Sequence, residues 1–555
     1  MQQLEFRVVS ALEKVFCETA PRVSPMVGKE SILLGESYAF QIAFRAGTSE
    51  KQQRIRLLPR AKRCAAGSIT VRGVDFVPAA LTRFAEHDHD FLQGAKPGLY
   101  PDVLSEIDAK SPVLALNTLW RSVWVEFTPH AAAKGGTYRV TVDFFDEAGA
   151  FYGSAGTQVK VIAAPLDAQT LYYTDWFHGD CISEYYHVKS LSDRHFALMR
   201  QFIETAVRSG VNMILTPIFT PPLDTAVGGE RPTIQLVGVR CENNTYTFDF
   251  TNLQRFVTLC QEAGIVYFEM SHLFTQWGAC AAPKIMARVQ GKMQRIFGWD
   301  TPAAGEAYKT FLCAFLPQLT AFLKSAGIAE RTFFHISDEP EKEHLESYRA
   351  ARAMTADYLQ DFCIIDALSD YDFFKSGLVE TPIPSSDHIK PFLAHHVPNL
   401  WTYYCCAQGD KVSNRFLAMS GARNRVIALQ LFRYDIKGFL HWGYNYWYSQ
   451  YSLKTIDPFA VTDAGYAFPA GDAFSVYPGK NGPIESIRLR VFASALCDLR
   501  AMQMLCRLTD KQTVLHIIEA DIAPIAFDCA PQDEDTVLKT RIAVNDALER
   551  QLSKG

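Results

Sequence analysis

From about Pro165 onward the sequence alternates apolar strands with amphipathic helices, and this alternation limits the fold more than any other feature. Strands are predicted over 171–176, 212–217, 266–272, 332–339, 363–368, 399–404, 438–442 and 473–477. Helices are predicted over 193–209, 250–263, 307–326 and 340–359. About eight strand–helix units of this length predict an α/β fold, a (β/α)8 TIM-like barrel with long loops. A doubly wound open sheet is the alternative, because periodicity gives the order of elements but not closure.

The chain before this region follows a different pattern. Apolar and polar residues alternate over 38–44, 68–71, 123–127, 138–144 and 159–161, with turn residues between these stretches. Such short alternating runs predict an antiparallel β-sandwich. We therefore expect three parts: an N-terminal β-sandwich over 1–165, the barrel over 166–508, and a C-terminal extension over 509–555. Within the extension, 543–552 is predicted to be a surface helix, and no role is assigned to it.

The dipeptide Asp338-Glu339 ends the fourth predicted strand, directly before Pro340. Proline lacks a backbone donor and restricts the residue before it, so we expect Glu339 to be extended and the strand to stop. In barrels and open α/β sheets, binding and catalysis take place at the carboxyl ends of strands, which makes both acids candidates for catalysis. The alternative is a helix start in which Asp338 caps the segment beginning at Pro340.

Acidic, imidazole and large aromatic side chains gather at the other predicted strand ends. They are Trp176, His178, Asp180, Asp224, Glu269, His272, Trp277, His335, Asp366, Trp401, Tyr403, Tyr404, His441, Trp442, Tyr444, Asn445 and Trp447. Aromatic faces pack on the apolar face of a sugar while carboxylates and amides bind its hydroxyls, so this mixture favours a carbohydrate ligand. A phosphate site would use glycine-rich loops with Arg or Lys, and an acyl-transfer site would use a GxSxG elbow, which the sequence lacks.

Each of these residues also has a structural interpretation. A single tryptophan at a strand end is more often part of the core than a sugar platform. His335 is in register with Ser337 and fits a barrel-interior histidine, while Glu269 and Asp366 fit structural acids that pair with cations inside the barrel. The functional hypothesis therefore rests on the coincidence of many such residues at one rim.

Composition and motifs argue against several functions. The formal charge is -5 over 555 residues, with no Lys/Arg block, so we expect no nucleic-acid partner. We find no secretory signal and no apolar segment that would span a bilayer, so we predict no membrane partner and a cytoplasmic location. The 13 cysteines lack metal-type spacing, and free thiols are expected. Without HExxH, a phosphate loop or GxGxxG, we expect no metal and no cofactor. The sequence carries no signal for an oligomeric state.

Several longer motifs occur in order between Trp176 and Gly479. They are WFHGD at 176–180, LTPIFTPPLDT at 215–225, FTQWG at 274–278, HISDEP at 335–340, LWTYYC at 400–405, SNRF at 413–416 and GFLHWGYN at 438–445. Together they resemble the catalytic domain of glycoside hydrolase family 123, much of which was long catalogued as an uncharacterised domain. The N-terminal sandwich also has a counterpart in that family.

The resemblance implies a β-N-acetylgalactosaminidase that acts on an oligosaccharide or glycoside with retention and substrate assistance. The Asp-Glu pair of the family matches Asp338 and Glu339. Glu339 would protonate the leaving glycosidic oxygen and later activate water. Asp338 would orient the 2-acetamido group, whose carbonyl oxygen attacks the anomeric carbon. Because Asp338 is close and the pocket is partly apolar, we expect a raised pKa for Glu339.

Other positions are expected to bind the sugar. Tyr403 or Tyr404 would donate to the acetamido carbonyl, and Trp401 and Trp442 would form the wall behind the sugar. The remaining substrate-binding candidates are Asn445, His335, His272, Trp277, His178, Asp180, Glu269 and Asp366.

The sequence departs from the family pattern beside the last predicted strand. Many relatives carry an acidic Arg-Asp-Gly type segment where this chain has VFASALCDLR at 491–500. One alternative is therefore a glycosidase for a different sugar or with a protein nucleophile, for which Glu269 and Asp366 are the candidates. A second is a carbohydrate-binding protein without turnover. The presence of both acids argues against this second alternative, because binding alone requires no proton donor.

Overall fold

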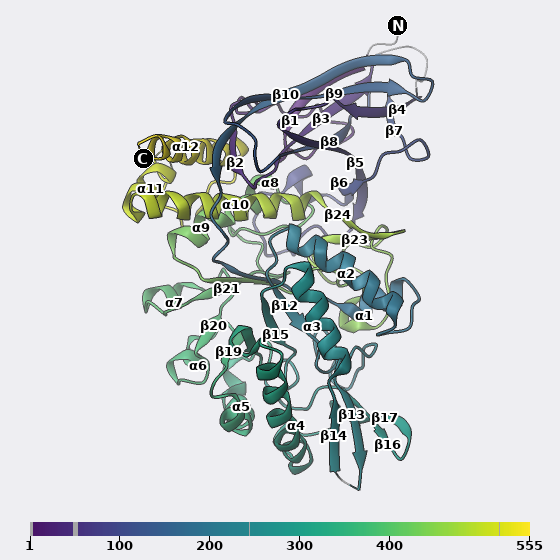
Figure 1. Ribbon diagram of the computed structural model, residues 1–555, viewed down its shortest axis with the longest axis vertical. Helices are drawn as coiled ribbons and strands as arrows, with labels where there is room; N and C mark the ends of the chain where they lie inside the picture. Colours follow the sequence, from purple (N-terminus) through teal and green to yellow (C-terminus); the bar gives the residue numbers. More distant parts are fainter. Residues whose placement is uncertain (1–3, 48–53, 244, 521, 555) are drawn as a thin grey trace.

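The computed structural model describes residues 4–47, 54–243, 245–520 and 522–554, and its N-terminal part contains two five-stranded sheets (Figure 1). The first sheet has the order β1 (Leu4–Ser10), β3 (Tyr38–Ala46), β8 (Arg121–Pro129), β5 (Gly67–Ala79) and β6 (Gly98–Ser105). The second has the order β2 (Ser31–Leu34), β10 (Phe151–Pro165), β9 (Gly136–Asp146), β4 (Arg54–Ala61) and β7 (Val113–Leu116). Phe44 and Phe144, one from each sheet, have ring centroids 5.6 Å apart in a shared core. Both the sheet-rich region and its face-to-face packing therefore follow from the alternating pattern.

The middle of the chain forms an eight-stranded parallel sheet. Its order is β20 (Thr381–Ile383), β19 (Cys363–Ala367), β18 (Thr332–Phe334), β15 (Tyr267–Met270), β12 (Met213–Thr216), β11 (Tyr172–Asp175), β22 (Gly438–His441) and β21 (Trp401–Tyr403). The two ends of this order meet at a parallel bridge between Ser385 and Tyr403. The sheet is thus a nearly closed barrel rather than a doubly wound open sheet.

One predicted barrel strand was wrong. Residues 473–477 were expected to be the eighth strand, but β23 (Val476–Gly479) pairs antiparallel with β24 (Gly482–Glu485) outside the barrel. The eighth barrel strand is β20, which has three residues and contains Pro382. So short a strand has no readable alternation, and a proline argues against a strand in sequence alone.

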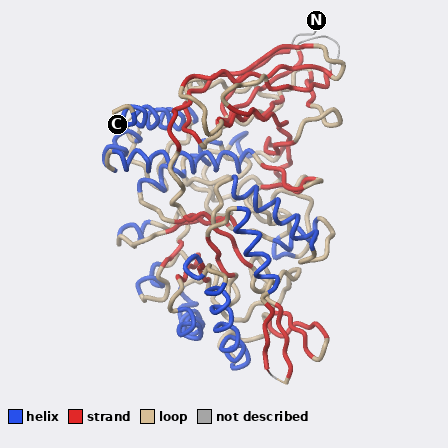
Figure 2. Tube along the Cα trace, in the orientation of Figure 1, coloured by secondary structure: helices blue, strands red, loops and turns tan. Residues whose placement is uncertain are grey.

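The helices lie around the barrel and at its end that faces the N-terminal sheets (Figure 2). They are α1 (Gly179–Tyr185), α2 (Asp193–Arg208), α3 (Thr251–Ala263), α4 (Glu306–Ser325), α5 (Leu345–Leu359), α6 (Tyr371–Lys375), α7 (Lys390–Ala394), α8 (Gly421–Arg425), α9 (Ile427–Arg433), α10 (Ile487–Leu508), α11 (Lys511–Ile518) and α12 (Glu534–Leu552). Local signals set their ends: the Ser192 hydroxyl caps α2, and Gly264 ends α3 at φ 106°. Among the described residues, no helix has the length and apolarity needed to cross a membrane.

A four-stranded sheet projects from the barrel, at the bottom of Figure 1. Its order is β14 (Thr245–Asp249), β13 (Gly238–Glu242), β16 (Ile285–Val289) and β17 (Lys292–Phe297). These strands belong to the long loops that follow β12 and β15, so the projection adds side chains to the carboxyl end of the barrel.

The C-terminal helix is not the surface helix that its sequence predicts. Helix α12 packs on α10 and β2, where the Arg541 guanidinium donates to Asp498 (2.8 Å) and to Glu36 (2.6 Å). The Asn545 amide donates to the Ser31 carbonyl at 2.7 Å. The helix thus connects the N-terminal sheets to the barrel through polar groups, which a sequence pattern based on apolar residues does not reveal.

A buried ion pair makes a second connection between the two regions. Arg488 at the start of α10 contacts Asp102 of β6 at 2.9 Å, and both side chains are almost fully buried. The Tyr477 hydroxyl also donates to Asp102, at 2.7 Å. Removing one partner of such a pair leaves a buried charge without compensation.

We therefore expect Asp102→Ala to lower the free energy of unfolding by about 3–5 kcal/mol. The matched control is Glu147→Ala, which breaks the exposed Arg56–Glu147 pair and should change stability by about 1 kcal/mol or less. Denaturant unfolding followed by circular dichroism measures both. Equal effects of the two substitutions would contradict a connecting role for the Arg488–Asp102 pair.

Candidate active site

A cavity of 190 Å³ opens at the carboxyl end of the barrel, and both Asp338 and Glu339 line it. Other predicted site residues on its wall are Tyr403, Trp277 and Trp442. The Trp277 backbone N–H donates to the Asp338 carbonyl at 2.8 Å, and the Trp442 indole N–H donates to Asp472 at 2.9 Å. The cavity thus brings together the acid pair and four of the aromatic side chains predicted at the strand ends, Trp176, Trp277, Tyr403 and Trp442.

The backbone at Glu339 differs from the sequence expectation. Its φ is +44°, in the left-handed region, although Pro340 follows and an extended conformation was predicted. Its N–H donates to the Ala367 carbonyl at 2.9 Å, which holds the residue in this conformation. Positive φ also occurs at three other residues on the cavity wall, Asp224, Trp277 and Tyr451. Strained backbone of this kind costs about 1–3 kcal/mol per residue and concentrates at functional sites.

The alternative role of Asp338 as a helix cap is not what the structure shows. The helical segment after Pro340 begins with a 3-10 turn, η3 (Lys342–His344), whose cap is Glu341. The Glu341 and His344 side chains form a reciprocal capping box there. The Asp338 side chain is therefore not used for capping and faces the cavity instead.

Burial raises the pKa of both acids. For Asp338, the nearby Glu339 charge raises the pKa further, and His335 partly opposes this effect. For Glu339, the hydrogen bond from the Tyr403 hydroxyl (2.6 Å) partly opposes the effect of burial. The pKa of Glu339 is therefore raised as expected, although burial and the Glu341 and Asp472 charges raise it rather than the Asp338 charge that the sequence suggested.

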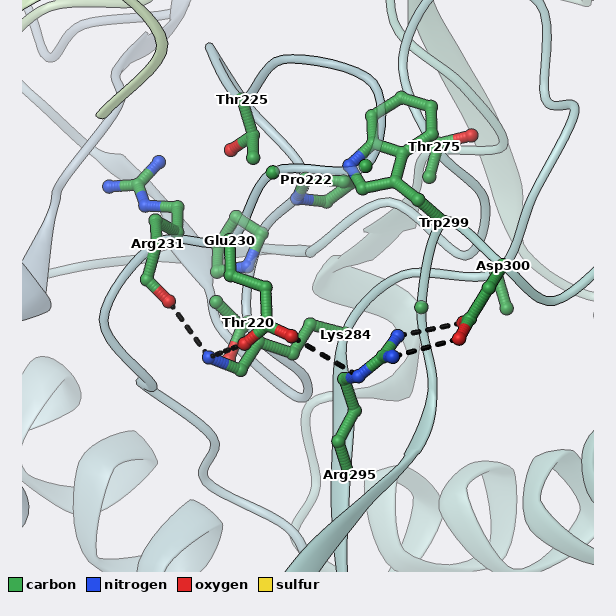
Figure 3. A pocket seen from close by; sticks show the side chains of 15 residues that line it. Thr220, Pro222, Thr225, Glu230, Arg231, Thr275, Lys284, Arg295, Trp299 and Asp300 are labelled. Carbon is green, nitrogen blue, oxygen red and sulfur yellow. Dashed lines mark hydrogen bonds and ion pairs between the residues drawn. The ribbon is translucent and has the colours of Figure 1, made fainter. Parts of the chain in front are cut away.

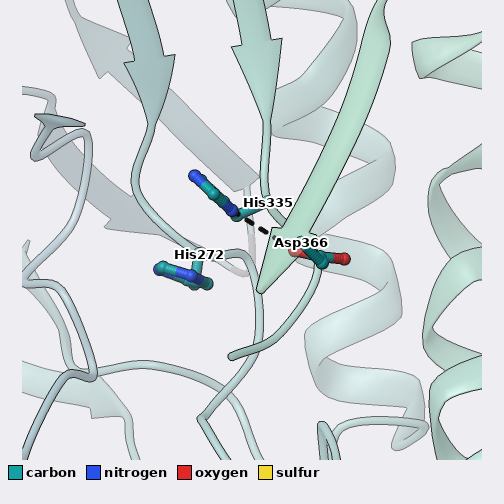
Figure 4. A group of neighbouring side chains, drawn as sticks. All are labelled: His272, His335 and Asp366. Atoms are coloured by element: carbon teal, nitrogen blue, oxygen red, sulfur yellow. Dashed lines mark ion pairs between the residues drawn. The ribbon is translucent and has the colours of Figure 1, made fainter. Parts of the chain in front are cut away.

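A buried network lies among the strand ends beside the acid pair (Figure 4). His335 Nε2 is 2.9 Å from Glu269, and its Nδ1 is 3.4 Å from Asp366. Burial opposes a charge on this imidazole, but Asp366 and Glu269 outweigh burial and raise the pKa of His335 to about 9. Asp366 also accepts from the Ile336 N–H at 2.9 Å and from the Tyr348 hydroxyl. Glu269 and Asp366 thus act as structural acids paired with a buried cation.

His272 stacks on His335, with ring centroids 4.3 Å apart and planes at 26°. Burial and the neighbouring His335 charge lower the pKa of His272 well below its ordinary value, so the ring is neutral. Donor atoms of His272, His335 and Asp366 lie within 4.8 Å of one another. However, a metal ion binds in the plane of each imidazole, and two nearly parallel stacked rings do not direct their lone pairs at one ion. The group fits a stacked cation–neutral pair better than a metal site.

His178, Asp180 and Asn445 form a second buried network beside the cavity. Arg231 donates to Asp180 at 3.0 Å and lies 3.2 Å from His178 Nδ1, while the Asn445 amide exchanges two hydrogen bonds with the His178 backbone. Burial and the Arg231 charge lower the pKa of His178 to about 4. These residues anchor the loops of the rim but do not line the cavity.

Trp401 and Tyr404 also lie away from the cavity. The Trp401 ring stacks on Tyr172 inside the barrel, with centroids 5.2 Å apart. A Cβ at Gly438 would lie only 1.9 Å from this ring, so the glycine makes room for it. Tyr404 is fully buried against Phe439. Tyr404 faces away from the cavity because side chains alternate between the two faces of a strand. Trp401 faces the barrel interior as Tyr403 does, but lies two residues earlier on the strand and so packs in the barrel core below the cavity. Neither residue takes its predicted sugar-binding position.

Several cavity residues were missed in the sequence. They are Leu223, Gln276, Ala367, Cys405, Cys406, Leu440, Gln450, Tyr451 and Phe468. Most of them adjoin a predicted strand end or motif, and only their side-chain direction was unknown. Gln450, Tyr451 and Phe468 belong instead to the long segment after β22, which has no periodic pattern. The Tyr451 N–H donates to the Asp224 carboxylate at 2.9 Å, which ties this segment to the rim.

Comparison with known proteins agrees with this geometry. Residues 176–505 match a model of a glycoside hydrolase catalytic domain, and a parallel barrel with paired acids at its carboxyl end is a frame for this class of enzyme. The protein is a glycoside hydrolase. The matching model is that of Glycoside hydrolase 123, catalytic domain, and the chain belongs to this family.

A family 123 glycoside hydrolase from Clostridium perfringens, solved in a study of glycolipid glycan hydrolysis, has the same fold. The TM-score is 0.76 at 14% identity, with 100% of both chains covered. A GH5 xyloglucanase from Bacteroides ovatus matches at a TM-score of 0.31 and 10% identity, over 89% of this chain and all of that one. An endo-β-1,4-mannanase from Thermotoga petrophila matches at a TM-score of 0.33 and 10% identity, over 60% of this chain and 77% of that one. TM-scores this low do not support a comparison of the active sites. No curated protein matches the chain.

The charge on His335 predicts a pH dependence of stability. Because the folded-state pKa (about 9) exceeds the ordinary value of 6.5, the contribution is complete below about pH 6.5 and is lost as pH rises through about 9. The contribution of the His335 charge to the free energy of unfolding amounts to roughly 3 kcal/mol. The thermal unfolding midpoint of the wild type should therefore fall between pH 6.5 and 10 as His335 loses its proton. In His335→Gln this part of the fall should be absent. His272→Gln is the control and should keep the wild-type slope, because His272 is neutral throughout; a wild-type slope in His335→Gln would disprove the charge.

Proposed function

We propose that this protein is a retaining exo-β-N-acetylgalactosaminidase in which the 2-acetamido group of the substrate performs the attack. The observation that carries the proposal is the position of two neighbouring carboxyl groups, Asp338 and Glu339, in one cavity with raised pKa values. A nucleophile supplied by the substrate requires no second carboxylate across the sugar ring, so adjacent acids suffice. The family and the aromatic wall support a carbohydrate substrate.

The chemistry assigns a different task to each acid. Glu339 donates its proton to the glycosidic oxygen as the acetamido carbonyl oxygen attacks the anomeric carbon. Asp338 accepts a hydrogen bond from the acetamido N–H and stabilises the positive charge that develops on the cyclised group. In the second half, Glu339 removes a proton from water, which opens the ring intermediate with net retention of configuration.

The location of the proton follows from these contacts. In the free protein, burial and the Glu339 charge favour the proton on Asp338. A hydrogen bond donated by the acetamido N–H favours ionised Asp338 instead. Substrate binding would therefore leave Asp338 ionised and the proton on Glu339, where the reaction requires it. A substrate without the acetamido group would not produce this redistribution.

The alternative with a protein nucleophile has less support. Glu269 and Asp366, the two candidates, are fully buried and do not line the cavity. Both already accept hydrogen bonds: Glu269 from Thr174 and Trp176, and Asp366 from Ile336 and Tyr348. A nucleophile must reach the anomeric carbon, so these acids fit a structural role better.

We expect Glu339→Gln and Asp338→Asn each to reduce kcat/KM for 4-nitrophenyl β-N-acetylgalactosaminide by about 100-fold or more, because each removes a group that acts in the transition state. Glu343→Gln, an exposed acid on η3, is the control and should leave activity unchanged. The GalNAc-derived thiazoline, which imitates the cyclised intermediate, should inhibit the wild type. If the enzyme hydrolyses its substrate and the thiazoline does not inhibit it, substrate assistance is ruled out. If the 4-nitrophenyl galactoside is hydrolysed faster than the N-acetylgalactosaminide, the enzyme acts on another sugar.

Tyr403→Phe should move the alkaline limb of the kcat/KM profile to higher pH. The Tyr403 hydroxyl stabilises ionised Glu339, so its loss raises the pKa of Glu339 and keeps the general acid protonated to higher pH. Tyr404→Phe is the matched control, because its buried hydroxyl has no hydrogen-bond partner in the described part of the chain and lies away from the cavity. A limb that stays in place or moves to lower pH in Tyr403→Phe would contradict the assignment of Glu339 as the acid.

A further inference from the structure

Figure 3 shows a second cavity, of 140 Å³. It shares a wall with the catalytic cavity. Two segments form this wall and direct neighbouring residues to opposite sides. Asp224 and Gln276 line the catalytic cavity. Their chain neighbours Thr225 and Thr275 line the second cavity. The second cavity is completed by the 228–231 loop and by residues at the base of the projecting sheet. It is therefore built beside the site where the sugar is cleaved.

The second cavity contains an aromatic side chain that the fold does not use. All eight tryptophans of the chain lie in the described part, and only the Trp299 indole makes no hydrogen bond and no contact with another ring or cation there. The ring is half-buried and lies at the cavity beside Pro222 and Thr275 (Figure 3). A half-buried indole at a cavity, with no ring, cation or hydrogen-bond partner among the described residues, can offer its apolar face to a ligand.

The charged groups of this cavity neutralise one another. Glu230 forms ion pairs with Lys284 at 2.8 Å and with Arg295 at 3.1 Å. Arg295 also forms a bidentate salt bridge with Asp300, with hydrogen bonds of 2.7 and 2.8 Å. These two cations and two anions leave no net charge, and the guanidinium of Arg231, which also lines the cavity, pairs with Asp180 at 2.9 Å. An ionic ligand would therefore meet a like charge as well as an opposite one. The same groups still present donors and acceptors to hydroxyl groups. The arrangement favours a neutral ligand rich in hydroxyls.

One polar atom in this cavity is left without a partner. Thr220 is 1% exposed and lines the cavity, and its hydroxyl makes no hydrogen bond among the described residues. Buried polar atoms are almost always satisfied by protein, water or ligand. The hydroxyl therefore marks a position where an outside group completes the hydrogen bonding.

We propose that this second cavity is a non-catalytic carbohydrate site that takes an internal, neutral sugar unit of the same oligosaccharide whose terminal residue is cleaved. The apolar face of the ring packs on Trp299, and its hydroxyls bind Thr220, Glu230 and Arg295. This inference rests on the proposed function, because it assumes that the catalytic cavity takes the terminal sugar. It makes the enzyme selective for longer glycans over simple glycosides.

The test compares two substrates on Trp299→Ala. For a tetrasaccharide with a terminal β-linked N-acetylgalactosamine, KM should rise about three- to tenfold with kcat unchanged, because a remote aromatic contact contributes uniform binding. For the 4-nitrophenyl monosaccharide glycoside, both constants should stay at wild-type values. Phe151→Ala, which removes an exposed aromatic ring from the N-terminal sheets, is the control and should change neither substrate. Equal effects on the two substrates, or none on the tetrasaccharide, would overturn the proposal.

A binding measurement separates this proposal from the proposed function. Saturation-transfer NMR with the tetrasaccharide is run on Glu339→Gln, which should not cleave it, and should show contacts from an internal ring. These contacts should be lost when Trp299→Ala is added and weakened when Thr220→Val is added. Thr220→Val keeps the side-chain shape and so tests the site even where the tryptophan variant misfolds. If no glycoside is hydrolysed but these contacts are present, the function fails and the site stands. Internal-ring contacts that are absent from Glu339→Gln, or that persist in both double variants, refute the site.

Discussion

The buried charge of His335 is the constraint on which the carboxyl end of the barrel depends. An imidazolium inside a barrel is costly unless acids surround it, and here Glu269 comes from β15 and Asp366 from β19, the two strands that flank β18. Asp366 additionally accepts from the Ile336 N–H, which fixes the backbone just beyond β18. Three neighbouring strands are thereby held in one relative position. The acid pair follows three residues after His335, so this network determines where Asp338 and Glu339 leave the sheet.

The catalytic cavity itself is made of irregular chain. Asp224, Trp277, Glu339 and Tyr451 come from four different loops and share a positive φ. Each of these conformations costs free energy, and hydrogen bonds between loops hold several of them: Trp277 to Asp338, Glu339 to Ala367, and Tyr451 to Asp224. Strained loops on a rigid barrel give fixed side-chain directions without regular secondary structure. Such an arrangement keeps two buried carboxyl groups side by side.

Polar contacts also join the regions of the chain. The Arg488–Asp102 pair and the Arg541 contacts to Glu36 and Asp498 connect the N-terminal sheets, α10 and α12. The guanidinium group suits these positions because it is planar and makes several hydrogen bonds in fixed directions. In the same way, the Arg231 guanidinium donates to the Leu223 carbonyl and anchors a loop that borders both cavities. Arginine side chains thus connect separate segments at each of these places.

The sequence by itself determined the alternation that builds the barrel, the alternating strands of the N-terminal sheets, and the position of the acid pair near the end of a strand. Seven of the eight predicted barrel strands are found, because long apolar runs with regular spacing are read from neighbouring residues alone. Only the tertiary structure decided which strand-end side chains face the cavity. Trp401 and Tyr404 pack in the core. Glu269 and Asp366 pair with His335, and Tyr451 belongs to a loop without a periodic pattern. The physical reason is that side-chain direction at the end of a strand depends on loop backbone angles and on charges brought together from distant parts of the chain, and neither leaves a local pattern.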